Sequence, residues 1–82
     1  MPSFHESNGY TFRIIPGDHG HPHAHIEGQG GTLKIWFTRS EVTRALVVGK
    51  IPKKMQGKLI REMETNLDKA SDLWDSYCKG LG

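Results

Sequence analysis

The fold of this chain is decided between residues 23 and 37, which read HAHIE (23–27), GQGG (28–31) and TLKIWF (32–37). Polar and apolar residues alternate on both sides of the glycines, which is the period of a half-buried strand. A glycine-rich segment between two such runs is typical of a tight connection. The sequence therefore predicts a β-hairpin with a four-residue loop at 28–31.

The loop pairs Glu27 with Thr32, and the rest of the register follows from that pair. Because side chains alternate across a strand, the hairpin has one apolar and one polar face. The apolar face, which we expect to be buried, holds Ala24, Ile26, Leu33 and Ile35. The polar face holds His23, His25, Glu27, Lys34 and Trp36. We expect the chemistry of the protein on this polar face.

The segments that flank the hairpin extend the sheet. Residues 10–15 read YTFRII and stop at a Pro-Gly pair, which predicts a strand. In that strand Phe12 and Ile14 face the core, and Arg13 lies on the other face. The apolar residues at 45–48 are short but consistent with a fourth strand.

A helical period begins after Pro52. Apolar residues then recur every three or four positions, which predicts an amphipathic helix. They are Met55, Leu59, Met63, Leu67, Ala70, Trp74, Tyr77 and Leu81. We expect one helix of about 26 residues that ends at Gly80, or two nearly collinear helices broken near Asn66. The predicted fold is α+β, with a three- to four-stranded antiparallel sheet and one long C-terminal helix packed on one face.

Length and composition set further expectations. With 82 residues, the chain has room for a single domain over 1–82. Its single cysteine, Cys78, excludes an internal disulfide. The longest apolar run, at 45–48, has four residues, far fewer than a membrane span needs, and the first residues lack a signal pattern. We therefore expect a cytoplasmic protein with no membrane partner.

Histidines are concentrated just before and within the hairpin. Residues 18–27 read DHGHPHAHIE and hold four of the five histidines. Two imidazoles on one strand face can act as acid and base on a phosphodiester, and nearby cations can stabilise the developing charge. This hypothesis is a metal-independent ribonuclease without a cofactor. Its catalytic residues are His23 and His25, with Lys34 and Arg13 at the phosphate and His19 and Glu27 orienting the rings.

Two other interpretations of the histidines stay open. The same residues offer ligands to a divalent metal such as Zn²⁺. His23 and His25 supply two nitrogen ligands, and His19, His21 or Glu27 completes the site. Alternatively, the histidines only cap backbone groups or face water.

A basic segment lies at the predicted start of the helix. Its exposed residues are Lys53, Lys54, Lys58 and Arg61, and acidic residues Asp68, Asp72 and Asp75 follow toward the other end. Both placements oppose the helix dipole, so we expect the basic residues to bind an RNA backbone or a protein partner. The alternative is an ordinary solvated helix face. Trp36, on the polar face, is a candidate for stacking a base, whereas Trp74 and Tyr77 fit the core.

Three motifs carry a resemblance to a known family. They are HGHPHAHIE at 19–27, KIW at 34–36, and LWD at 73–75 followed by Tyr77. Together they resemble the bacterial 4160 family of domains of unknown function. The resemblance implies the toxin half of a toxin–antitoxin pair, bound by a small antitoxin protein, and toxins of this size are often endoribonucleases that act on RNA. The rival hypothesis is a non-catalytic module that binds protein or nucleic acid.

Overall fold

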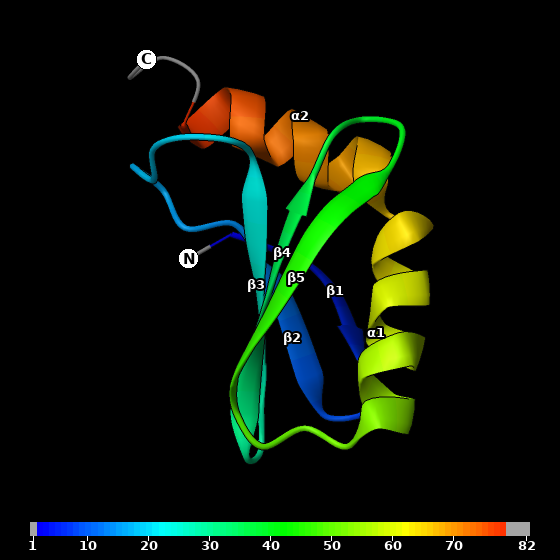
Figure 1. Ribbon diagram of the computed structural model, residues 1–82. Helices are drawn as coiled ribbons and strands as arrows, with labels where there is room; N and C mark the ends of the chain where they lie inside the picture. Colours follow the sequence, from blue (N-terminus) through cyan, green and yellow to red (C-terminus); the bar gives the residue numbers. More distant parts are fainter. Residues whose placement is uncertain (1, 79–82) are drawn as a thin grey trace.

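Five antiparallel strands form one sheet in the order of the chain (Figure 1). The computed structural model describes residues 2–78. The strands are β1 (Ser3–Ser7), β2 (Tyr10–Arg13), β3 (His23–Gly28), β4 (Gly31–Phe37) and β5 (Val42–Gly49). Two helices, α1 (Lys53–Glu64) and α2 (Leu67–Tyr77), follow them. The α+β class is confirmed, but the sheet has more strands than the three or four predicted, and two helices replace the single long one.

The central hairpin has the predicted register. His25 pairs with Lys34, and His23 pairs with Trp36. The loop is shorter than predicted, because Gly28 still pairs with its partner on β4 and only residues 29–30 connect the strands. Gly30 has a φ of 89°, a conformation that favours glycine and permits this tight connection.

The prediction missed β1. Asn8 and Gly9 turn the chain between β1 and β2 with φ values of 55° and 80°. An Asn-Gly pair with both residues at positive φ is typical of a two-residue hairpin turn. The signal was therefore present in the sequence. The segment before it is polar and lacks the alternation that marked the other strands.

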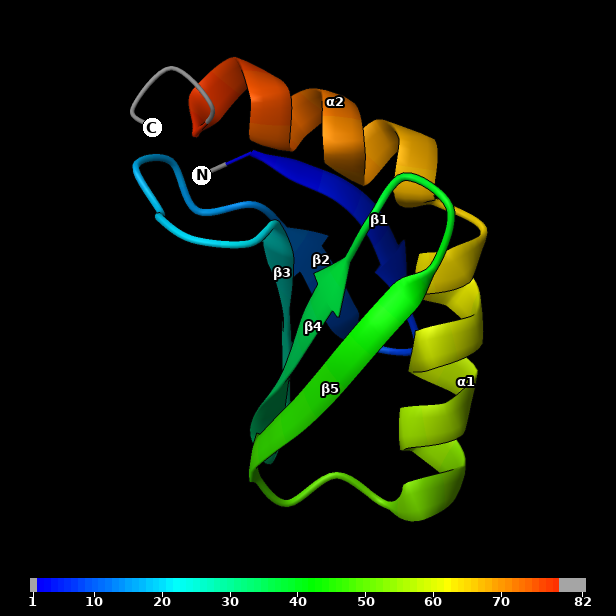
Figure 2. The same cartoon turned by 45° about the horizontal axis from the view of Figure 1, so that its top comes forward.

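The core lies between one face of the sheet and α1. The largest fully buried side chains include Phe12, Ile26 and Leu33 from the strands and Leu59 and Met63 from α1. Each such burial stabilises the fold by about 1.5–3 kcal/mol. Figure 2 shows α1 running along the sheet and α2 lying across one end of it. The opposite face of the sheet is the one that carries the polar side of the hairpin.

The two helices meet at a sharp bend at Asn66 and are not collinear (Figure 2). The Asn66 side chain is buried, and its Nδ2 donates hydrogen bonds to Glu62 O at 2.8 Å and Thr65 Oγ1 at 3.2 Å. The Glu62 carbonyl also accepts hydrogen bonds from Thr65 N and Thr65 Oγ1, so several donors close the end of α1 where the chain turns. Tyr77, predicted in the core, is 47% exposed because α2 covers only the end of the sheet. Leu81 and Gly80, the predicted end of the helix, lie outside the described residues.

The bend also changes where the acidic residues lie relative to a helix dipole. Asp68 lies in the first turn of α2, where a negative charge is favourable. Asp68, Asp72 and Asp75 all lie within 3.5, 3.0 and 3.7 Å of the guanidinium of Arg39, in the β4–β5 connection. The expectation that this acidic segment opposes the helix dipole throughout is therefore wrong. No helix within residues 2–78 is long and apolar enough to cross a membrane.

Candidate metal centre

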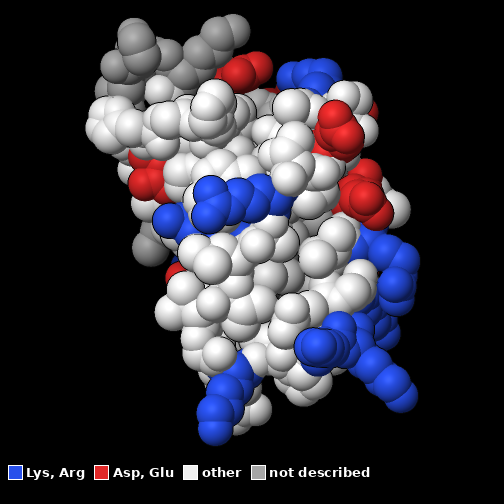
Figure 3. All heavy atoms as spheres, viewed as in Figure 1, with Lys and Arg blue, Asp and Glu red and all other residues white. Residues whose placement is uncertain are grey.

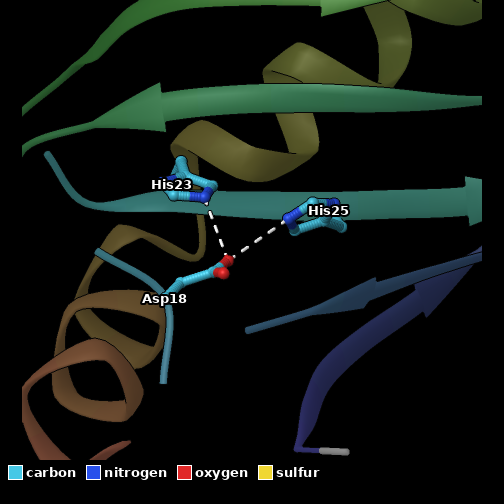
Figure 4. Close-up of side chains that lie close together, drawn as sticks. All are labelled: Asp18, His23 and His25. Atoms are coloured by element: carbon cyan, nitrogen blue, oxygen red, sulfur yellow. Dashed lines mark ion pairs between the residues drawn. The ribbon is translucent and has the colours of Figure 1, made fainter. Parts of the chain in front are cut away.

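Three side chains converge where β3 begins: Asp18, His23 and His25 (Figure 4). One ligand atom from each lies within 4.8 Å of the other two. Asp18 Oδ2 lies 3.0 Å from His23 Nε2 and 3.5 Å from His25 Nε2. A carboxylate oxygen and two imidazole nitrogens thus surround one small volume.

The local fold explains this convergence. His23 and His25 are two residues apart on β3, so both rings leave the same face of the strand. Asp18 lies in the β2–β3 connection, where Gly17 has a φ of 86°. The backbone N–H of Gly17 donates a hydrogen bond to Tyr77 O at 3.3 Å, which ties the connection to the end of α2. The last helix therefore holds the carboxylate against the histidines.

The two histidines differ in exposure. His23 is 7% exposed, with its ring centroid 5.7 Å from that of Trp36 and 5.2 Å from that of Trp74. The expectation that both rings stand open on the polar face is therefore wrong for His23, because α2 covers the start of β3. The side chain of His25 is 20% exposed. Of the two rings, His25 is therefore the one more accessible to solvent, and the Asp18 side chain is 29% exposed.

The hydrogen bond at the far side of His23 defines its tautomer. Nδ1 lies 2.9 Å from the carbonyl oxygen of His21, which only accepts, so Nδ1 carries a proton. In a neutral ring, Nε2 then presents its lone pair toward Asp18 Oδ2. Asp18 Oδ2 and His25 Nε2 are both buried and have no hydrogen-bond partner within the described residues. Electron pairs thus face one another in a buried volume, which is unfavourable unless a proton or a cation lies between them.

The environment of His25 favours its neutral form. Burial lowers the pKa of this imidazole, and the neighbouring His23 lowers it further, while Asp18 acts in the opposite direction. Lys34, opposite on β4, also lowers the pKa. At neutral pH the ring therefore offers a lone pair, which is the form that binds metal ions.

The comparisons with known proteins identify the family. A model described as Domain of unknown function (DUF4160) matches residues 9–75. The chain belongs to the DUF4160 family. No curated protein and no solved structure gives a significant match. The matched range contains Asp18, His23 and His25.

The structure places two predicted cations beside the centre. Arg13 and Lys34 are the cross-strand neighbours of His25 on either side. Arg13 Nε lies 3.1 Å from Glu27 Oε1. Glu27 therefore pairs with a cation on β2, and it is not one of the three residues that converge on the centre.

The other predicted residues of this DUF4160 domain lie elsewhere. His19 and His21 are exposed in the β2–β3 connection, outside the cluster formed by the described residues. The basic residues predicted to bind RNA or a partner lie exposed on α1, which packs on the other face of the sheet. They are Lys53, Lys54, Lys58 and Arg61. The structure thus separates the basic helix from the histidines.

Asp18 is the residue that sequence reasoning did not assign. It opens the histidine-rich run and directly follows the Pro-Gly pair that ends the preceding strand. A carboxylate next to several histidines is itself a signal for a mixed oxygen and nitrogen ligand set. Its contact with His23 depends on how the connection folds, which alternation along the strands does not predict.

Proposed function

We propose that this domain binds a divalent transition-metal ion through Asp18 Oδ2, His23 Nε2 and His25 Nε2. The observation that carries the proposal is the pairing of His23 with Asp18. Nδ1 of that ring is already used by the His21 carbonyl, and the other ring nitrogen, Nε2, faces a buried carboxylate oxygen at 3.0 Å. A cation between these atoms converts the unfavourable contact into two coordinate bonds.

The spacing of the three atoms supports the proposal. Zn²⁺ binds nitrogen at about 2.0–2.1 Å and oxygen at about 2.0–2.2 Å, so two ligand atoms of a tetrahedral site lie about 3.3 Å apart. The separations from Asp18 Oδ2, 3.0 and 3.5 Å, lie on either side of this value. All three ligand atoms lie within 4.8 Å of one another, so side-chain rotations can bring them onto one ion.

The chemistry of the ligands indicates which metals fit. Two neutral imidazoles and one carboxylate suit Zn²⁺, Fe²⁺, Co²⁺ or Ni²⁺ better than Mg²⁺ or Ca²⁺, which prefer oxygen. A hydrogen bond from the free ring nitrogen to a backbone carbonyl is the usual support of a metal-binding histidine. His23 has that bond in place. Three protein ligands leave one position of a tetrahedral site for water or another molecule.

Isothermal titration calorimetry of the untagged, chelator-treated domain with ZnCl₂ tests the proposal. We expect one ion per chain, and at least a tenfold loss of affinity in His25→Ala and in Asp18→Asn. The matched control is His21→Ala, which removes an exposed imidazole but keeps the backbone carbonyl that His23 uses. A wild-type protein that takes up no stoichiometric metal, or a control that loses as much affinity as His25→Ala, would show that the proposal is wrong.

A second candidate function is metal-independent cleavage of RNA, as the toxin half of a pair with a small antitoxin. It is supported by the position of His25, a partly exposed ring with a lowered pKa between Arg13 and Lys34. Such a ring can act as a general base beside cations that hold a phosphate. The burial of His23 gives this candidate less support, because the second imidazole has little access to a substrate. RNA cleavage that persists in EDTA and disappears in His25→Ala would favour it over the metal centre.

A further inference from the structure

A pair of cations lies on one aromatic ring next to the metal centre. Lys34 Nζ is 5.4 Å and Arg44 Cζ is 5.0 Å from the centroid of the Trp36 ring. The same ring contacts His23, at 5.7 Å between centroids. Two positive charges, an aromatic surface and the centre thus form one continuous area.

These two cations have no anionic partner of their own. Within residues 2–78, neither Lys34 nor Arg44 has a carboxylate within ion-pair distance, whereas Arg13 pairs with Glu27 and Arg39 pairs with residues of α2. Two like charges on one ring repel each other, and among residues 2–78 only their attraction to the Trp36 ring, with no carboxylate, acts against that repulsion. A bound anion is the complement that this arrangement lacks.

The area lies on the polar face of the sheet, which α2 covers only where β3 begins. Trp36 pairs with Arg44, and Lys34 pairs with Leu46, so all four side chains lie on the polar face of β4 and β5. Leu46 is 43% exposed, and Val48, on the same face, is 59% exposed. Figure 3 shows basic side chains in a band across the strands, apart from the group beside α1. The cations and apolar side chains of this face are therefore accessible together.

We propose that this open face binds a single-stranded nucleic acid, with a phosphate between Lys34 and Arg44 and the neighbouring phosphodiester at the open position of the metal. The inference rests on the proposed metal site. It deepens that proposal by naming the ligand class.

Three features favour this ligand. Basic side chains on β2, β4 and β5 are spread over three strand spacings of about 4.8 Å each, a span suited to an extended backbone with repeated charges. The planar guanidinium of Arg44 matches a phosphate with two parallel hydrogen bonds. Trp36 and the exposed apolar side chains of β5 offer surfaces to unstacked bases, which single strands present and duplexes do not.

Fluorescence anisotropy with a labelled ten-nucleotide RNA, a DNA of the same sequence and an RNA duplex tests this inference on the Zn²⁺-loaded domain. We expect both single strands to bind more tightly than the duplex. We expect Lys34→Gln and Arg44→Gln each to weaken binding at least fivefold. Each should also reduce the slope of log K against log salt by about 0.7, the value for one lost phosphate contact on a single strand. Lys69→Gln, an exposed lysine on α2, is the matched control and should leave both quantities unchanged.

The outcomes separate this inference from the metal proposal. Lys34→Gln and Arg44→Gln should keep the Zn²⁺ affinity of the wild type, measured by the same titration as before. Stoichiometric Zn²⁺ binding without any binding of single strands would overturn the inference and leave the metal site standing. Loss of strand binding in a Lys54→Gln, Lys58→Gln double variant, with Lys34→Gln unaffected, would place the nucleic acid on α1 and would equally overturn it.

Discussion

Asp18→Asn is expected to raise the stability of the metal-free domain while it lowers its affinity for metal. The amide replaces an unpartnered buried carboxylate oxygen with a group of the same shape. Its Nδ2 can donate to the lone pair of His23 Nε2, which lies 3.0 Å from the oxygen that it replaces. An unfavourable contact thereby becomes a hydrogen bond.

The size of the effect follows from this exchange. A net hydrogen bond contributes about 1 kcal/mol, and relief of an unpaired buried acceptor adds about the same again. For a domain of this length, each kcal/mol shifts the Tm by about 4–8 °C. We therefore expect the Tm of Asp18→Asn to exceed that of the wild type by about 8–16 °C in EDTA at pH 7.5.

Thermal unfolding followed by circular dichroism, in EDTA and in excess ZnCl₂, measures both sides of the prediction. Zn²⁺ should raise the Tm of the wild type and leave Asp18→Asn almost unchanged. Glu64→Gln controls for the loss of one negative charge, since Glu64 is exposed and has no ion pair among residues 2–78. A lower Tm for Asp18→Asn in EDTA would mean that Asp18 and a protonated His23 form a stabilising ion pair, and the argument for a metal would fail.

Three further predictions concern the metal and the scaffold. At a free Zn²⁺ concentration 100 times the Kd, the wild type should gain about 2.7 kcal/mol in unfolding free energy, and no gain in excess Zn²⁺ would contradict the metal site. Glu62→Gln should cost about 2 kcal/mol in urea unfolding at pH 7, because Glu62 accepts hydrogen bonds at 2.8 Å from both His5 and Ser7. Those bonds lower the pKa of Glu62. The contribution of Glu62 to the unfolding free energy is therefore complete above the usual glutamate range and is lost as the pH falls through the lowered pKa. A difference in stability between Glu62→Gln and the wild type that persists below that pKa would refute this cause. Gly30→Ala should destabilise the domain by about 1–3 kcal/mol in the same assay, because Gly30 has a φ of 89° and the new methyl group would lie 2.8 Å from Lys50 O; an unchanged midpoint would refute it.

The sequence predicted those parts of the fold that depend on neighbouring residues. Alternation over residues 23–37 was sufficient for the register of the hairpin, because a shift by one residue would bury the histidines and expose Ile26 and Leu33. The bend at Asn66 was only partly predicted. The angle between the helices depends on a buried side chain that bonds to the preceding turn and on the end of the sheet, and neither is visible as a period in the sequence.

The candidate site was likewise predicted only in part. The common face of His23 and His25 follows from strand geometry and was predicted. The burial of His23 depends on Trp74, and the position of Asp18 depends on a backbone contact between Gly17 and α2, about 60 residues along the chain. These long-range contacts turned a pair of histidines into a centre of three converging ligand atoms.

The dependence of this centre on α2 has a consequence for synthesis of the protein. Gly17 N–H binds Tyr77 O, and Cys78 Sγ donates to Ile15 O at 3.4 Å, so the loop that carries Asp18 is anchored by the last residues that the structure describes. A nascent chain still inside the ribosome lacks that anchor. Binding of the proposed ion would therefore wait until translation of this region is complete, and a truncation before Trp74 would leave a polypeptide that has both histidines but not the anchored loop that carries Asp18.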